Sequence, residues 1–168
     1  MLTARCHRGF TLIELLIVIA LIGVLSAISA PFLIAARSAA NEASAIQALR
    51  TLVSAQSTFA TSCAHGTYTT SLNTLVSGEF ASPDLDITPR SGYSFQLGAS
   101  AGSKAGANDC TGAPTRTGFY FRAEPLADDT GRRAFATNHV GTIWQDISGI
   151  APPEPFAAVG TITPLDTH

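Results

Sequence analysis

The chain begins its hydrophobic pattern with one long run, in which no residue from 15 to 36 carries a formal charge. At a helical rise of about 1.5 Å per residue, such a run measures about 33 Å, enough to cross the hydrocarbon core of a membrane. We therefore predict a transmembrane helix over residues 10–36. Pro31 is expected to kink this helix or to melt one of its turns.

Apolar residues continue at helical spacing beyond this run, and the helix is predicted to continue amphipathically over residues 37–63. Arg37, Glu42 and Arg50 begin its charged side. We expect the apolar stripe to pack on a sheet, leaving the opposite, alanine-rich face free for other copies of the chain. The stripe consists of Ile46, Leu49, Leu52, Val53, Phe59 and Ala60.

A period of two appears later in the chain and predicts strands. Two strands are marked by alternating apolar residues, which are Tyr93, Phe95 and Leu97, then Phe119, Phe121 and Ala123. Two further short strands flank the turn-rich residues 138–141. The globular part, residues 64–150, is thus expected to hold a meander of about four antiparallel strands.

The remaining segments read as connections. Residues 65–90 are broken by Gly and Pro and predict a loop with one helical turn, and residues 101–115 predict an exposed loop. The Pro-rich tail, residues 151–168, lacks helical periodicity and is expected to be extended. The resulting fold class is α+β, with a long N-terminal helix packed on a small antiparallel sheet.

Composition and charge indicate how the chain is oriented across the membrane. The chain has 168 residues and a formal net charge of -2, which does not indicate a nucleic-acid-binding surface. Arg5, His7 and Arg8 precede the apolar run, and such a positive flank stays on the cytoplasmic side. The chain beyond the run is therefore expected to face outward.

Glu14 is the unusual residue, because it lies at the start of the apolar run. A carboxylate inside a membrane segment costs about 3 kcal/mol on insertion scales and is tolerated mainly beside a cation or a polar cavity. Neither a plain anchor nor a signal peptide cleaved after Ser29 offers such a partner. A lipoprotein signal fits worse, since Cys6 precedes the hydrophobic run.

The residues Arg8-Gly9-Phe10-Thr11-Leu12-Ile13-Glu14, followed by Gly23 and Pro31, resemble the processing and methylation signature of type IV pilins and pseudopilins. The resemblance implies a pilin-like fold. It also implies a prepilin peptidase that cleaves after Gly9, methylates the new amino terminus at Phe10 and discards the leader, residues 1–9.

In this family the acid at the position of Glu14 pairs with the amino-terminal cation of a neighbouring subunit. Phe10, Glu14, Gly23 and Pro31 are therefore expected to act in assembly, with the helix losing order between Gly23 and Pro31. Two plainer interpretations stay open. The first is that Glu14 only snorkels to the membrane interface beside Arg8. The second is that Gly23 and Pro31 are ordinary membrane-helix residues.

The function that the resemblance implies is structural, that of a class-a type IV pilin or a pilin-like filament subunit. The expected partners are further copies in a helical filament, the prepilin peptidase and methyltransferase, an inner-membrane assembly platform, and lipid before assembly. The precursor would lie in the bacterial inner membrane with its globular domain in the periplasm, then in a filament at the cell surface. Alternatives are a type II secretion pseudopilin and a DNA-uptake minor pilin.

Cys63 and Cys110 both follow the membrane segment, where a disulfide is permitted, and we favour a bond between them. Closing a loop of this length suggests about 4 kcal/mol of stabilisation in the chain-entropy model. Cys6 would leave with the leader.

Other candidate sites are weak, and no enzyme, metal or cofactor is expected. His65, His139 and His168 are scattered, without a hydrolase or metalloprotease motif. Two pairs of acids could bind calcium but are better explained by turns, namely Asp84 with Asp86 and Asp128 with Asp129. Four arginines could contact nucleic-acid phosphates but fit a solvated strand edge better, namely Arg116, Arg122, Arg132 and Arg133.

Overall fold

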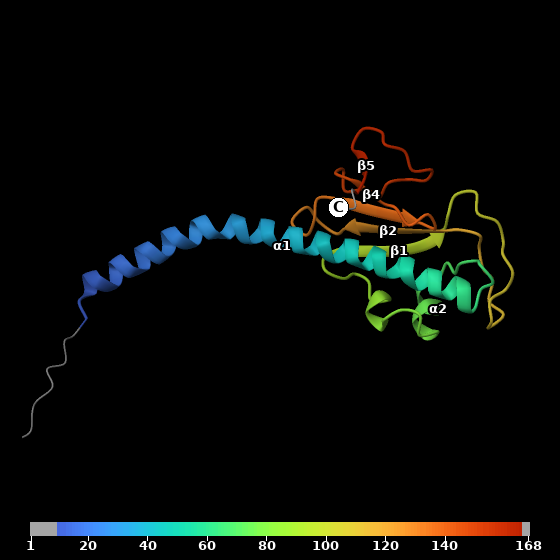
Figure 1. Cartoon of the computed structure of the whole chain (residues 1–168). Coiled ribbons are helices and arrows are strands. Elements are labelled where there is room, and N and C mark those ends of the chain that lie inside the picture. Colours follow the sequence, from blue (N-terminus) through green and yellow to red (C-terminus); the bar gives the residue numbers. More distant parts are fainter. Residues whose placement is uncertain (1–9, 166–168) are drawn as a thin grey trace, which may run out of the picture. The chain divides into compact units, whose positions relative to one another are not determined.

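The computed structural model describes residues 10–165 (Figure 1). Contacts within the chain divide it into two compact units, Met1–Ala36 and Arg37–His168. One helix, α1 (Leu12–Ser62), belongs to both units, with its apolar first half in the first and its amphipathic half in the second. The α+β class and the long N-terminal helix predicted from the sequence are confirmed.

The end of α1 is set by a change of backbone conformation. Gly66 adopts a φ of +85°, a conformation that favours glycine, and its N–H donates to the carbonyl of Ala60 at 2.8 Å. This bond satisfies one of the last helical carbonyls. The helix therefore stops at Ser62, next to the predicted end at residue 63.

Pro31 lies inside α1, and the helix is continuous through it. Proline has no N–H, so the carbonyl four residues earlier loses its helical donor. Of the two outcomes expected at Pro31, the melted turn is wrong for this structure, and the kink stays a prediction. The loss of one hydrogen bond is small beside the bonds that the surrounding turns retain.

The second unit contains one antiparallel sheet with the order β1-β2-β3-β4-β5. Its strands are β1 (Tyr93–Ala99), β2 (Phe119–Pro125), β3 (Ala134–Asn138), β4 (Ile143–Asp146) and β5 (Ile162–Pro164). The count is five instead of the expected four, because the tail adds β5 to the edge of β4 in the register Gln145 to Thr163. A three-residue strand is too short to show a period of two.

The core lies between α1 and one face of the sheet. Alternate strand residues such as Phe95, Phe121 and Phe135 are at most 5% exposed, and they pack with Leu49 and Leu52 of the helix. Ile46 and Val53 are half-buried at the border of this core. The amphipathic stripe and the strand alternation thus meet on the same buried interface.

Two short elements lie in the connection between α1 and β1. They are the helix α2 (Leu72–Ser77) and the 3-10 turn η1 (Pro83–Leu85), where the sequence predicted one helical turn. Leu75 and Leu85 are buried in the core. Phe80 packs edge-on against Phe59 of α1 with ring centroids 5.3 Å apart.

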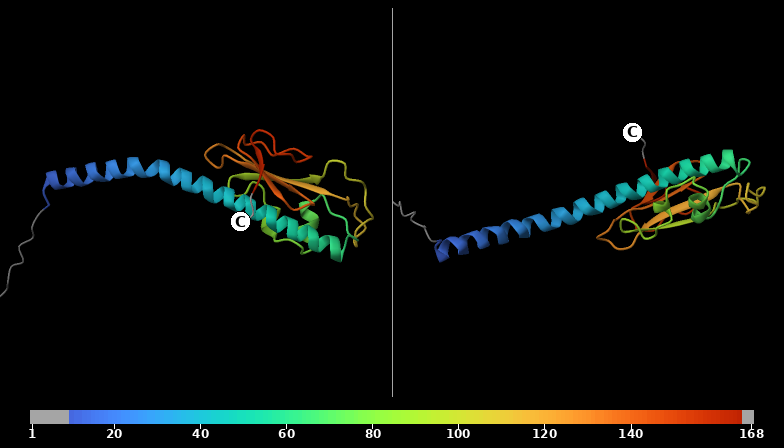
Figure 2. Two further views of the ribbon diagram at one scale, coloured as in Figure 1. Left: turned by 45° about the horizontal axis from the view of Figure 1, so that its top comes forward. Right: turned by 90° about the horizontal axis from the view of Figure 1, so that it is seen from below.

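The C-terminal tail covers the other face of the sheet, so that helix, sheet and tail form three layers (Figure 2). Ala136 points away from the core, because it pairs with Trp144 between core-facing neighbours, yet it is fully buried. Pro152 of the tail is fully buried as well, and its carbonyl accepts a 2.7 Å hydrogen bond from the hydroxyl of Tyr120. The tail is therefore an integral layer of the domain.

Candidate membrane and assembly segment

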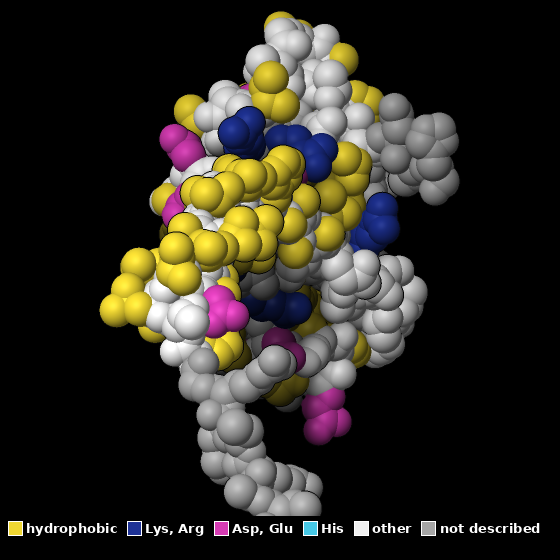
Figure 3. All heavy atoms as spheres, turned by 90° about the vertical axis from the view of Figure 1, so that its left-hand side faces the viewer, with side chains coloured by type: hydrophobic (Ala, Val, Ile, Leu, Met, Phe, Trp, Pro, Cys, Tyr) yellow, Lys and Arg dark blue, Asp and Glu magenta, His cyan; other side chains and the backbone are white. Residues whose placement is uncertain are grey.

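The first half of α1 presents an apolar surface that nothing in the described chain covers. Its large apolar side chains from Phe10 to Ile34 are between 43% and 77% exposed. Figure 3 shows hydrophobic side chains crowded on this side of the molecule. Within residues 10–165, α1 is the one helix long and apolar enough to cross a membrane, with a mean hydropathy of 2.7. Such a surface needs lipid or other protein around it.

Thr11 and Glu14 form a capping box at the start of α1. The Thr11 backbone N–H and hydroxyl donate to Oε2 of Glu14 at 3.0 and 2.8 Å, and the Glu14 N–H donates to the Thr11 hydroxyl at 3.3 Å. These bonds satisfy donors that the first helical turn leaves free. A Thr followed three residues later by Glu is a recognisable signal for this motif, and our sequence analysis missed it.

The capping box uses one oxygen of the Glu14 carboxylate. Both donated bonds end on Oε2, whereas Oε1 takes no hydrogen bond from the described residues. Phe10, the residue before Thr11, is 75% exposed. The carboxylate can therefore accept a further donor through Oε1 without breaking the cap.

Gly23 and Pro31 lie on the same open helix. A Cβ added to Gly23 would meet no heavy atom within 4 Å, so nothing within the described chain requires glycine there. Near Pro31, the hydroxyl of Ser29 donates to the carbonyl of Leu25 at 2.8 Å. The expected loss of helical order between Gly23 and Pro31 on assembly stays a prediction. Gly9, the expected cleavage residue, lies outside the described residues.

Glu42 corrects the sequence analysis, which placed it on the charged, solvent-facing side of the helix. It is 6% exposed, and its carboxylate accepts hydrogen bonds from the backbone N–H groups of Arg132 and Arg133 at 3.0 and 3.3 Å. The Arg133 guanidinium completes the pair at 2.6 Å. Burial is possible because every oxygen of the acid is paired. Helical spacing gave no signal for a partner so far along the chain.

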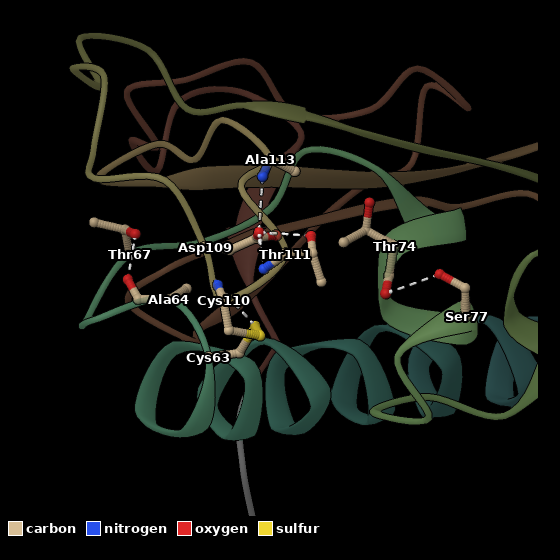
Figure 4. Close-up of a disulfide and its surroundings, with 9 residues drawn as sticks. All are labelled: Cys63, Ala64, Thr67, Thr74, Ser77, Asp109, Cys110, Thr111 and Ala113. Atoms are coloured by element: carbon tan, nitrogen blue, oxygen red, sulfur yellow. Dashed lines mark hydrogen bonds between the residues drawn. A yellow bond between two sulfur atoms is a disulfide. The ribbon is translucent and has the colours of Figure 1, made fainter.

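Cys63 and Cys110 are joined by a disulfide, which ties the end of α1 to the loop between β1 and β2 (Figure 4). The Cys110 N–H also donates to the Cys63 carbonyl at 2.8 Å. Beside the bridge, Oδ1 of Asp109 accepts bonds from the N–H groups of Thr111 and Ala113, both at 2.8 Å. These bonds give the loop a fixed turn at its attachment point.

The four arginines considered for phosphate contacts are not brought together. Arg116 lies before β2, at the opposite end of the sheet from Arg132 and Arg133 before β3. Arg122 lies in β2, an internal strand, where its guanidinium is 3.7 Å from Glu124. The expectation of a solvated strand edge is therefore wrong for Arg122.

The two pairs of acids considered for calcium occupy separate turns. Asp84 is part of η1 and Asp86 ends it, whereas Asp128 and Asp129 lie in the connection between β2 and β3. Within residues 10–165 no group of three or more His, Cys, Asp or Glu side chains is placed to hold a metal ion.

Comparison with known proteins bears on the N-terminal segment. Residues 4–30 match the family model described as the prokaryotic N-terminal methylation motif. No curated protein and no solved structure matches the chain. The matched range contains Thr11, which caps the apolar helix, and Glu14 and Gly23 within it. The N-terminal segment therefore carries the processing motif of type IV pilins and pseudopilins.

Proposed function

We propose that the protein is a structural subunit of a type IV pilus or pilus-like filament. It is inserted in the inner membrane, cleaved after Gly9, N-methylated at Phe10 and polymerised through its apolar helix. The observation that carries the proposal is the methylation motif at residues 4–30, placed at the start of a helix whose exposed, apolar first half holds a single acid, Glu14.

Lipid covers the apolar half of α1 before assembly, and the same half of other copies covers it afterwards. The environment is apolar in both states, so the transfer from lipid to filament changes little in the burial of hydrophobic surface. Close packing and paired polar groups then decide the register of one helix against the next.

Glu14 provides such a polar group. Cleavage after Gly9 places an ammonium group on Phe10, and the free Oε1 of Glu14 on a neighbouring copy accepts it while Oε2 keeps the Thr11 cap. An ion pair between apolar helices loses little to solvent screening and gains from every added hydrogen bond. The pair thus sets the axial register at which subunits join.

The second half of α1 supports close packing between copies. Its face away from the sheet is exposed and carries small side chains, which include Ala36, Ala39, Ala40 and Ala43. Small residues let helix backbones approach closely. This face is suited to the interior of a filament in which the sheets point outward.

The experiment that tests the function is intact-mass analysis with amino-terminal sequencing of the protein from membranes and from sheared surface material of its native host. An N-methylated Phe10 terminus in abundant sheared filaments supports the pilus subunit. The same terminus confined to membranes instead favours a secretion pseudopilin or a minor pilin. A chain beginning at Met1 or Ala30 overturns the proposal, because Glu14 then lacks its cation.

A further inference from the structure

The globular unit holds a cavity of about 520 Å³ on the side of the sheet that the tail covers. Its walls come from the end of β1, the turn between β3 and β4, and the tail. Both aromatic and polar side chains line it, including Asn138, His139, Thr142, Trp144, Glu154 and Phe156. These segments meet only in the folded domain.

Glu154 builds one wall of this cavity by pinning the tail. Its Oε1 accepts bonds from the Ser100 hydroxyl at 2.8 Å and the Asn138 amide at 2.7 Å, and its Oε2 accepts from the Ala101 N–H at 2.7 Å. Three donors around one carboxylate hold it in place and occupy three of its acceptor positions. The wall is therefore preorganised.

Trp144 and Phe156 build the apolar wall. Their rings are stacked, with centroids 5.5 Å apart and planes inclined by 16°. The ring of Tyr120 lies tilted against that of Phe156, with centroids 6.1 Å apart. Trp144 and Phe156 are each half-buried, so aromatic surface remains available to a ligand.

The chemistry of the lining restricts the ligand. Among the described residues that line the cavity there is no Lys or Arg, and their one carboxylate, that of Glu154, disfavours anions such as phosphate. The three hydrogen bonds on Glu154 use both of its oxygens, so a cation would have to displace a donor to bind there. His139 and Thr142 are exposed beside the aromatic wall and offer hydrogen-bonding groups to a ligand. An aromatic face bordered by neutral polar groups suits a molecule with an apolar face and many hydroxyls.

We propose that this cavity binds a neutral saccharide ring, with the C–H face of the sugar against the aromatic wall that Trp144 and Phe156 build and its hydroxyls toward His139 and Thr142. The inference deepens the proposed function. It rests on that function only for the presentation of the cavity on a filament surface. A filament built around α1 would present the tail side of every subunit outward. Many weak sites along one filament would then bind a glycan-covered surface with high avidity.

The test uses the full chain, purified in a non-glycosidic detergent so that no sugar headgroup competes. Trp144 is the sole tryptophan, so intrinsic fluorescence reports on the cavity alone. The probes are the methyl glycosides of glucose, galactose, mannose and N-acetylglucosamine. A saturable shift of the emission with at least one of them, and none with inorganic phosphate, is expected. Absence of a shift across the panel, or an equal shift with phosphate, overturns the proposal.

Variants then locate the binding. Phe156→Leu and His139→Ala should each weaken the titration by about 3- to 10-fold, with an unchanged circular-dichroism spectrum. The matched control is Val159→Ala, an exposed tail residue outside the cavity, which should leave the titration unchanged. His139 is exposed, so its variant should fold even where Phe156→Leu does not. Unaltered binding by folded His139→Ala and Thr142→Ala proteins contradicts the assigned site.

The titration is made on unassembled subunits, so its result does not depend on filament formation. N-methylated filaments without sugar binding would overturn the cavity proposal alone. Sugar binding by the purified chain, together with a Met1 terminus on the protein isolated from its native host, would overturn the filament proposal alone.

Discussion

Glu42 and Arg133 are 91 residues apart in the chain, and the Glu42 carboxylate lies 2.6 Å from the Arg133 guanidinium in the folded domain. Two backbone N–H groups bind the other oxygen of the acid, so the connection between β2 and β3 is held against α1 at one point. Asn41 adds a 2.9 Å bond to the carbonyl of Thr130 in the same connection. This end of the domain therefore depends on two adjacent helix residues.

Glu42→Gln should lower the free energy of unfolding by about 2 kcal/mol, because an amide places N–H donors against the guanidinium and the N–H groups that Glu42 now accepts from. Arg133 is partly exposed and can turn to solvent, which limits the loss. Urea unfolding followed by near-UV circular dichroism measures it. Glu79→Gln, at an exposed position, is the matched control and should change the value by less than about 0.5 kcal/mol. Equal losses in the two variants would contradict the role of Glu42.

The same pair makes stability depend on acid. Burial acts to raise the pKa of Glu42, but hydrogen bonds from Arg132 and Arg133 and the charge of Arg133 outweigh it, so the pKa lies below its ordinary value of 4.5. The contribution is thus complete above pH 4.5 and is lost as the pH falls through the lower folded-state pKa. Urea midpoints measured from pH 7 downward should stay constant as far as Glu42 is concerned and begin to decrease below pH 4.5.

Asp109 and Asp146 also have lowered pKa values, since hydrogen bonds outweigh burial at both, and they add to the acid dependence. The Glu42→Gln variant isolates the share of Glu42. Its stability should fall less steeply with acid than that of the native chain. A curve parallel to the native one over the whole acid range would refute the assignment to Glu42.

Reduction of the disulfide should destabilise the globular unit. The bridge joins residues 47 positions apart, for which the chain-entropy model gives about 4 kcal/mol. The double variant with Cys63→Ser and Cys110→Ser should show a loss up to that size in urea unfolding. Reductant should destabilise the native chain and leave the double variant unchanged.

Thiol titration of denatured protein gives an independent check of processing. Three cysteines occur in the sequence and two are bonded, so a precursor that retains its leader should show one free thiol, from Cys6. A processed chain should show none. One free thiol in a chain that begins at Phe10 would mean that the disulfide is incomplete.

Glu14→Ala should leave an inserted and cleaved subunit that assembles poorly, because the ammonium group of the neighbouring Phe10 loses its acceptor. Thr11→Val is the matched control. It removes the hydroxyl of the capping box and keeps the Glu14 carboxylate and the Thr11 N–H bond. Filament yield after shearing should fall strongly in the first variant and little in the second. Equal losses of filament yield in the two variants would mean that Glu14 acts only by capping the helix.

Gly9→Val should leave the chain uncut, since a branched side chain replaces the residue that the peptidase accepts. The intact mass of the membrane-bound protein then retains the leader, while the insertion of the apolar helix is unchanged. Leu2→Val, a change within the leader away from the cleavage point, should be processed normally. Efficient cleavage of the Gly9→Val chain would refute the processing site.

Residues whose burial follows a local period were predicted correctly, and residues whose partners lie far along the chain were not. Leu49 and Phe59 were placed correctly on the buried stripe, and Tyr93, Phe95 and Phe121 on one face of the sheet. Glu42 was misplaced because its spacing is equally compatible with a solvated face, and its partners lie far along the chain. The fifth strand was missed because Ile162 and its neighbours carry no pattern of their own and gain strand geometry only from pairing with β4.

The long helix, the alternating strands and the methylation motif can all be predicted from the amino-acid sequence, because each depends on residues close together in the chain. Helical and strand periods are properties of the local backbone, and the motif is read as a continuous segment. Three features are visible only in the folded chain, namely the burial of Glu42, the layer formed by the tail, and the cavity between Trp144 and Glu154. These features arise where segments distant in sequence meet, and such contacts leave no period in the sequence to be read.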